Sequence, residues 1–269
     1  NWSTLTAVTV IHLVITAVSV YATWIEPFRI QVSYEDLHSS KLDGSAALRL
    51  LHISDLHVEK ITLREQRLLD RIARLDPDLV VLTGDYLNLS SVYDPESHEA
   101  VRNHLREICE RSRGPVYAIT GSPPVDLKGV VPQIFEGLPI KWLLDEVEPL
   151  QIGGHRIYIA GLQCTRERSR DAPRLRRLLN EVPANEFTLL LYHSPDLMPE
   201  AVELGVDLYL CGHTHGGQIR LPFVGALVTS SEFWKRYEMG RYEENGATLY
   251  VSRGLGMEGL GAPRARLLS

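Results

Sequence analysis

The sequence is short of cysteine and of basic charge, and each shortage excludes a class of protein. Its 269 residues include three scattered cysteines, which are too few for a disulfide framework and lack the C-x-x-C pair of a zinc site. The formal net charge is −6, whereas sequence-independent binding to nucleic acid needs a dominant basic face. No nucleic-acid partner is therefore expected. The length suits one sizeable domain or two small ones.

Charged residues are also missing from the amino-terminal stretch. Residues 2–25, WSTLTAVTVIHLVITAVSVYATWI, contain none, and as a helix they would be about 36 Å long, against a hydrocarbon core of roughly 30 Å. Trp2 lies at one end and Tyr21 and Trp24 at the other, where aromatic side chains meet the membrane interface. We therefore expect a membrane-anchor helix over residues 1–25. A buried helix or strand of the domain and a cleaved signal peptide are the alternatives.

A polar connector over residues 26–45 leads to residues 46–269, in which apolar runs alternate with helical patterns. Strands that alternate with helices early and form hairpins late predict one layered α/β domain over this range. Arg29 and Lys41 follow the apolar stretch, and basic residues beside a membrane segment favour the cytoplasmic side. We therefore expect the domain at the cytoplasmic face.

Local signals place several helices within this domain. Thr62 and Glu65 match a capping box, which predicts that a helix begins there. Apolar residues at helical spacing predict a second helix over residues 95–112, and His104 is expected on its surface. Pro173 is expected in the first turn of a third helix, where proline is tolerated best.

Carboxylates and imidazoles stand directly after four of the predicted strands, at the edge where open α/β sheets bind their ligands. They are Asp55, His57, Asp85, His193, His213 and His215. Oxygen and imidazole ligands without thiolate suit Mn, Fe or Zn better than Ca or structural Zn. A single Asp-x-His pair or strand-end histidine is commonly a core or solvated residue. Four such segments in successive β units instead indicate one metal centre.

The segments HISDLH, LVVLTGDYLN, YHSPD and GHTHGGQIRLP resemble the calcineurin-like metallophosphoesterase superfamily, in particular its membrane-anchored or exported bacterial, YkuE-like branch. The resemblance covers residues 46–261 and implies an αββα sandwich with two divalent metal ions. It also implies the ligands: Asp55, His57 and His215 for the first metal, Asp85 as the bridging carboxylate, and His193 and His213 for the second. Asp85 and His213 are the predicted catalytic residues.

The reaction implied by the resemblance is hydrolysis of a phosphodiester or pyrophosphate by a hydroxide that bridges the two metals. A lipid-linked or nucleotide–lipid phosphate at the membrane is the expected substrate. Arg253 is expected to bind the substrate phosphate through its planar guanidinium. Six arginines between residues 166 and 177 suit phosphate, anionic lipid or a solvated helix face.

One motif of the family is incomplete in this chain. Family members have Gly-Asn-His followed by Asp or Glu after the third strand, whereas residues 121–126 read GSPPVD. Proline has no side-chain donor and cannot replace the histidine. Ser122 and Asp126 are expected as weak ligands or outer contacts, with a surface carboxylate as the alternative for Asp126. Asn88 is expected to contact phosphate, to support the site or to close a turn.

The incomplete motif also defines an alternative function. A degenerate homologue would bind a metal or a phosphorylated ligand without efficient catalysis. With three protein ligands and water, the second metal would still have an ordinary catalytic coordination, so the sequence favours the enzyme.

Overall fold

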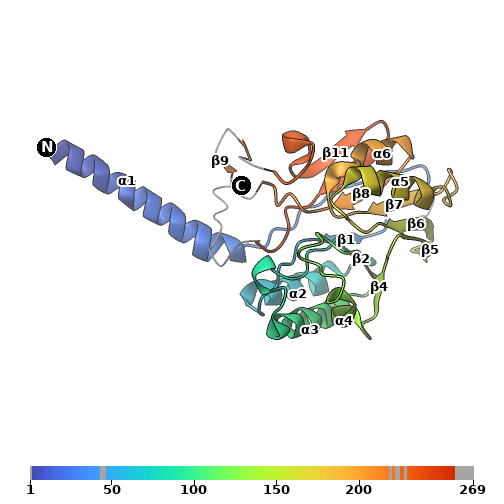
Figure 1. The fold of residues 1–269 in the computed structure, drawn as a ribbon, viewed down its shortest axis with the longest axis horizontal. Coiled ribbons are helices and arrows are strands. Elements are labelled where there is room, and N and C mark those ends of the chain that lie inside the picture. The colour runs from blue at the N-terminus through green and yellow to red at the C-terminus, as the bar shows by residue number, and fades with distance from the viewer. Residues whose placement is uncertain (1, 43–46, 218–219, 222–224, 227–228, 258–269) are drawn as a thin grey trace.

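The computed structural model describes residues 2–42, 47–217, 220–221, 225–226 and 229–257. Two β-sheets face each other in the domain, and helices cover the outer face of each sheet (Figure 1). This is the αββα sandwich that the motifs predicted. Residues 46, 218–219, 222–224, 227–228 and 258–269 of the predicted domain lie outside the described residues.

The first sheet has four parallel strands in the order β1-β2-β3-β4. Their bounds are β1 Leu50–Ile53, β2 Leu79–Leu82, β3 Val116–Ala118 and β4 Ile140–Trp142. The helices that follow in the chain are α2 Leu63–Leu75, α3 Pro95–Arg111 and α4 Val131–Phe135. Every residue of β2 is buried, as expected for a central strand with both faces covered.

The second sheet has six strands in the order β11-β12-β8-β7-β6-β5. Their bounds are β5 Glu146–Ile152, β6 His155–Gly161, β7 Phe187–Leu191, β8 Leu208–Cys211, β11 Gly240–Glu244 and β12 Ala247–Val251. The four central strands are parallel, and β5 and β11 pair antiparallel at the edges. Helices α5 Arg168–Leu179 and α6 Met198–Glu203 accompany this sheet, and a short pair joins β9 Arg220–Leu221 to β10 Gly225–Ala226.

Three apolar layers hold the sandwich together. Leu79 and Val81 of the first sheet and Leu189 and Leu210 of the second belong to the central layer between the sheets. The other two layers lie between each sheet and its helices. Because the parallel strands of both sheets present their carboxyl ends at one edge, the loops that follow them can meet there.

The helix signals in the sequence were largely correct. The Thr62 side chain accepts from the backbone of Arg64, and Glu65 accepts from the backbone of Thr62 at 2.8 Å, so the capping box is confirmed. The expected first-turn position of Pro173 is wrong, because α5 begins five residues earlier, at Arg168. Backbone bonds to the carbonyl of Glu167 already form that earlier turn, so Pro173 lies inside the helix.

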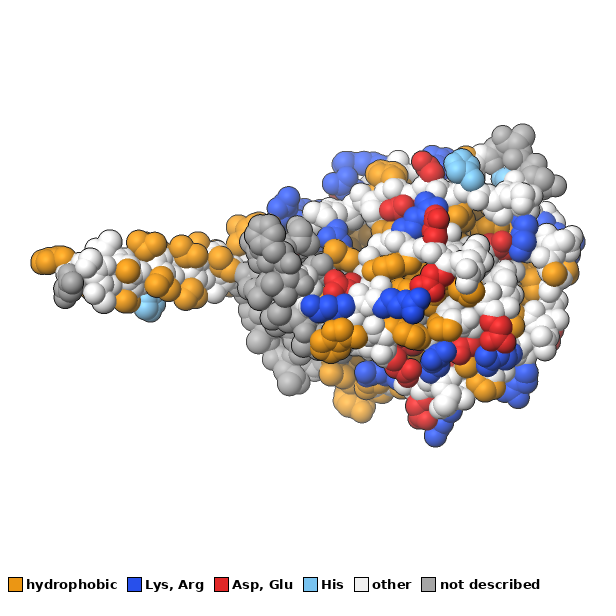
Figure 2. All heavy atoms as spheres, turned by 90° about the horizontal axis from the view of Figure 1, so that it is seen from above, with side chains coloured by type: hydrophobic (Ala, Val, Ile, Leu, Met, Phe, Trp, Pro, Cys, Tyr) orange, Lys and Arg blue, Asp and Glu red, His pale blue; other side chains and the backbone are white. Residues whose placement is uncertain are grey.

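The amino-terminal helix α1, Trp2–Val20, continues into a π-helical turn, Tyr21–Ile25, and projects from the domain (Figure 1). Its 19 residues are long and apolar enough to cross a membrane, and none is buried. Figure 2 shows apolar side chains along this projection and mixed charges on the domain. Such an apolar surface calls for an apolar partner, although a signal sequence has the same length and composition.

The described part of the connector, residues 26–42, lies against the domain. Its 3₁₀ turn Glu26–Phe28 contacts α2, where Arg67 donates to the carbonyl of Phe28 at 2.6 Å. Farther along, Lys41 forms an ion pair with Asp207 at 2.9 Å. The connector is therefore held at both ends by polar contacts.

His104 does not lie on the surface, as the sequence pattern suggested. Its side chain on α3 is fully buried, and neither ring nitrogen has a hydrogen-bond partner within the described chain. Burial lowers the pKa of His104 to about 4; the charge of Glu65 opposes this shift and that of Arg64 adds to it. Position 104 shares the buried face of α3 with Val101 and Ile108, and it was assigned to the surface only because histidine is polar.

The buried His104 predicts acid-sensitive stability. Between about pH 6.5 and 4 the unfolded chain takes up a proton that the folded chain does not, so the free energy of unfolding falls as the pH is lowered through this range. The full loss is roughly 3 kcal/mol. His104→Leu should remove that part of the pH dependence in denaturant titrations. Equal pH slopes for the two proteins would contradict the assignment.

Candidate metal centre

The structure brings the six predicted residues together at one edge of the sandwich. Asp55 and His57 follow β1, Asp85 follows β2, His193 follows β7, and His213 and His215 follow β8. Their ligand atoms form two compact, buried groups: Asp55, His57 and His215 in one, and Asp85, His193 and His213 in the other. This division matches the one that the motifs implied.

Five of these six residues have a left-handed backbone. The φ angles are 53° at Asp55, 42° at His57, 55° at Asp85, 69° at His213 and 50° at His215. Such a conformation costs roughly 1–3 kcal/mol per residue, and it persists where surrounding structure enforces it, often at functional sites. Glycine permits the crowding here: a Cβ on Gly121 would lie 2.2 Å from Asp85 Oδ1, and one on Gly212 would lie 2.0 Å from Asp55 Oδ2.

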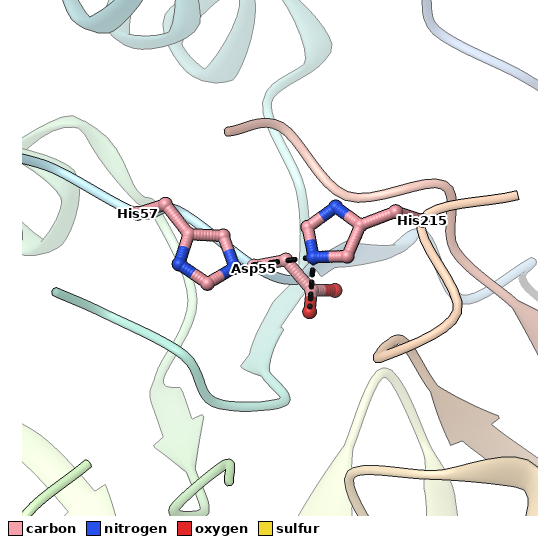
Figure 3. A group of neighbouring side chains, drawn as sticks. All are labelled: Asp55, His57 and His215. Atoms are coloured by element: carbon pink, nitrogen blue, oxygen red, sulfur yellow. Dashed lines mark hydrogen bonds and ion pairs between the residues drawn. The ribbon is translucent and has the colours of Figure 1, made fainter. Parts of the chain in front are cut away.

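The first group is built around His215 (Figure 3). Its Nε2 lies 3.1 Å from His57 Nε2 and 3.5 Å from Asp55 Oδ1. The other ring nitrogen of His57, Nδ1, lies 2.9 Å from the carbonyl oxygen of Leu87. When Nδ1 donates to that carbonyl, the lone pair of Nε2 points toward Asp55 and His215, as in most histidines that bind metal.

The second group has the same construction. His193 Nε2 lies 3.3 Å from Asp85 Oδ2, and His193 Nδ1 lies 2.8 Å from the carbonyl oxygen of Thr83. Ser122 Oγ completes the group at 3.1 Å from His193 Nε2 and 3.4 Å from His213 Nδ1. The serine of the incomplete motif thus stands among the second-group donors.

Asp85 faces both groups. Its Oδ2 lies 3.3 Å from His193 Nε2 and 3.7 Å from His57 Nε2. The backbone N–H of Ser122 donates to its other oxygen, Oδ1, at 2.6 Å, which fixes the carboxylate plane. This placement suits a carboxylate shared between two cations.

The donor spacing fits bound metal ions. Two donors that each lie about 2.0–2.2 Å from one ion are roughly 2.8–3.6 Å apart at tetrahedral or octahedral angles. The contacts named above within the two groups are 3.1–3.5 Å long, and all ligand atoms of each group lie within 4.8 Å of one another. Oxygen and imidazole donors without thiolate are the set that divalent Mn, Fe and Zn accept.

The electrostatics also suit a cation. Burial lowers the pKa of His213 to about 3, so its imidazole is neutral at pH 7. Burial would raise the pKa of Asp85, but His193 and His57 lower it below its usual range. Burial opposes protonation of His193, yet the Asp85 carboxylate raises its pKa well above the ordinary value. The buried Asp85 carboxylate thus favours a positive charge beside it, which a proton on His193 supplies here and which a bound cation would also supply.

Asp126 is not the surface carboxylate suggested as one alternative. It is buried and accepts hydrogen bonds from the backbone N–H groups of Gly121 at 2.6 Å, Asp85 at 2.8 Å and Tyr86 at 3.0 Å. Burial and the charge of Asp85 raise its pKa to about 7. These bonds tie the GSPPVD loop to the backbone of Asp85 and use both carboxylate oxygens, so Asp126 is an outer contact of the second group and not one of its ligands.

Asn88 and Arg253 lie beside the two groups rather than within them. Asn88 accepts from the backbone of Ser90 at 3.1 Å and donates to the carbonyl of Met257 at 2.9 Å, which is the turn-closing role. Arg253 donates to Gln31 Oε1 of the connector at 2.5 Å. Its contact with a substrate phosphate stays a prediction.

The arginines between residues 166 and 177 are mainly ion-paired. Arg168 pairs with Glu200 at 2.9 Å and Arg176 with Glu203 at 2.7 Å, which supports a solvated helix face. Arg166 differs from them. It is exposed, has a φ of 63°, and its charge helps to lower the pKa of His213, so it lies near the second group.

A family model of calcineurin-like phosphoesterases matches residues 48–217, which include both residue groups. The chain belongs to the calcineurin-like phosphoesterase family. It is 29% identical over 245 residues to the uncharacterised metallophosphoesterase YkuE of Bacillus subtilis, covering 88% of this chain and 82% of YkuE. The predicted resemblance to the YkuE-like branch is thereby confirmed.

Two further relatives are named for an enzymatic activity. Phosphodiesterase YaeI of Escherichia coli is 26% identical over 230 residues, which cover 80% of this chain and 77% of YaeI. UDP-2,3-diacylglucosamine pyrophosphatase LpxG of Chlamydia trachomatis is 23% identical over 289 residues, which cover 88% of this chain and 87% of LpxG. The chain therefore matches most of the length of each relative.

Proposed function

We propose that this protein is a phosphohydrolase that uses two divalent metal ions to cleave a phosphodiester or pyrophosphate bond. The observation that carries the proposal is the Asp85 carboxylate, which faces two separate donor groups at 3.3 and 3.7 Å. Asp55, His57 and His215 would hold one ion, and Asp85, His193 and His213 the other. When bound, such ions polarise phosphoryl oxygens and lower the pKa of water into the neutral range.

The protein's own residues arrange the conditions for this chemistry. The carbonyls of Leu87 and Thr83 orient His57 and His193, so that one nitrogen of each ring faces the centre. The candidate ligands are already grouped without a bound ion, and preorganised dipoles are a major source of catalysis. Ser122 offers a hydroxyl where the family has an asparagine amide, so a weaker and more exchangeable second ion is expected.

We also propose that the substrate is a lipid-linked phosphate and that α1 anchors the enzyme in the membrane at the cytoplasmic face. The exposed apolar helix supports the anchor, and the similarity to a pyrophosphatase of a diacylated sugar nucleotide supports the substrate class. Arg29 and Lys41 after the helix support the cytoplasmic side. Arg253 and Arg166 are the candidates for binding the phosphate.

The test of the proposed function is metal-dependent turnover. The full chain in neutral detergent, supplied with Mn²⁺, should hydrolyse bis(p-nitrophenyl) phosphate, and the same protein stripped with EDTA should not. Restoring Mn²⁺, Fe²⁺ or Zn²⁺ separately identifies the metal. A UDP-linked diacylated sugar and its deacylated form then test the lipid preference. Turnover that is unaffected by EDTA would contradict the proposal.

A binding protein without turnover is the second candidate, and one observation favours it. Pro123 occupies the family's histidine position, is exposed, and offers no proton to a leaving group. This candidate predicts a chain that binds metal yet leaves both the activated phosphodiester and the lipid unhydrolysed.

A further inference from the structure

A cavity of about 320 Å³ lies between the connector and α2, and four arginines line it. They are Arg29 of the connector and Arg67, Arg71 and Arg74 of α2, and we call this set the arginine groove. The three on α2 share one face, since residues three, four and seven positions apart lie together on a helix. Asp70 also lines the cavity, and it is 3.9 Å from the guanidinium of Arg111. The groove is therefore strongly cationic.

Within the described residues, the guanidinium charges of the groove are not compensated by carboxylates bonded to them. Arg29 donates to the Tyr21 hydroxyl at 2.8 Å, and Arg67 donates to a backbone carbonyl. Arg71 and Arg74 are exposed, and in the described part of the chain they form neither an ion pair nor a hydrogen bond. A cluster of unpaired arginines of this kind suits an anionic, phosphate-bearing partner.

Most arginines of α5 are ion-paired instead. Arg168 and Arg176 each bind a glutamate of α6. Figure 1 shows α5 on the far sheet, away from α1, whereas α2 lies next to the point where α1 enters the domain. Arg177 of α5 also forms no ion pair within the described chain, but it stands alone, whereas four arginines line one cavity where the amino-terminal helix meets the domain.

The position along the chain places the groove at the level of lipid headgroups. Helix α1 is about 28 Å long, close to the thickness of the hydrocarbon core. Tyr21 and the exposed Trp24 follow it, and such aromatic side chains lie at the membrane interface. Since Arg29 bonds directly to Tyr21, the groove begins just beyond that interface.

We propose that the arginine groove binds the phosphate groups of anionic lipids and so docks α2 on the membrane surface. The inference rests on the proposed anchoring of α1 in the membrane. Docking at α2 would also fix the orientation of the metal centre, because β1 precedes α2 and delivers Asp55 and His57. The domain would then present its site at a constant distance from the lipid surface.

Lipid retention measured by native mass spectrometry tests this proposal. The full chain in neutral maltoside micelles is offered dioleoylphosphatidylglycerol or dioleoylphosphatidylcholine, and the ratio of lipid-bound to free protein is recorded. We expect the anionic lipid to be retained more strongly. An arginine near an anionic surface changes binding roughly fivefold, so Arg71→Glu with Arg74→Glu should weaken retention by about 25-fold or more.

A charge reversal on a different helix provides the matched control. Arg177→Glu reverses an exposed charge on α5 and should leave retention unchanged. Equal retention of the two lipids or no effect of the double variant would each overturn the proposal. Hydrolysis of the soluble phosphodiester, measured on the same samples, should be unchanged in the double variant. Lipid retention is measured without hydrolysis. A protein that retains the anionic lipid but hydrolyses no phosphodiester would therefore contradict the proposed enzymatic function alone.

Discussion

Replacing Asp85 by asparagine is expected to lower hydrolysis of bis(p-nitrophenyl) phosphate by more than about 100-fold. Loss of a residue that only supports a metal ligand costs about 10–100-fold, and Asp85 is proposed to bind both ions directly. Asparagine keeps the size of the side chain but removes the negative charge that faces His193 and His57. Two cations would then lie close together without the anion between them.

Asp70→Asn is the matched control for this prediction. It makes the same chemical change at an exposed carboxylate on α2, whose contact with Arg111 is 3.9 Å long, and should leave the rate unchanged. Initial rates are compared at saturating Mn²⁺, so that weakened binding of the ions is offset as far as possible. Equal rates for Asp85→Asn and the wild-type protein would remove Asp85 from the chemistry.

Replacing Asp126 by alanine is expected to destabilise the fold by roughly 3 kcal/mol or more. The carboxylate accepts three buried backbone N–H groups, from Gly121, Asp85 and Tyr86. A buried donor left without a partner costs about 1–3 kcal/mol, and alanine leaves all three. The measurement is urea denaturation with EDTA present, so that metal binding does not contribute to the stability of the folded state.

Two comparisons make the Asp126 prediction specific. Asp70→Ala, at an exposed position, should change the free energy of unfolding by no more than about 0.5 kcal/mol. Asp126→Asn retains a carbonyl acceptor and should lie between alanine and the wild type. If Asp126→Ala unfolds at the same urea concentration as the wild-type protein, the three backbone bonds do not stabilise the GSPPVD loop.

The grouping of the six candidate ligands could be predicted from sequence because each of them follows the end of a strand. A run of buried β residues followed by Asp or His identifies a strand end, and parallel strands bring such ends together. Asp55, Asp85 and His193 were found in this way. The capping box at Thr62 and Glu65 was predictable for a simpler reason, since both of its hydrogen bonds are local.

The features that the sequence did not reveal depend on contacts between distant segments. Asp126 is 41 residues from Asp85, whose backbone it holds, and no local pattern indicates that pairing. His104 is polar, yet its burial depends on how α3 meets α2. Lys41 and Asp207 are separated by 166 residues, so the attachment of the connector emerges only in the folded chain.

Five of the six candidate ligands have a left-handed backbone, which places the candidate site at sharp turns after the strands. The chain turns sharply at these residues, and glycine at positions 121 and 212 leaves the space that Asp85 and Asp55 require. Stored strain of this kind is retained when the neighbouring structure enforces it. The sandwich core and the Asp126 bonds supply that enforcement.

Metal content per chain is the most direct test of the account. After equilibration with Mn²⁺ and removal of unbound ion, elemental analysis of the full chain should give two equivalents for the wild-type protein and no more than one for Asp85→Asn. A wild-type protein that holds one metal equivalent or none would contradict the two-ion centre, if added Mn²⁺, Fe²⁺ or Zn²⁺ does not increase its metal content.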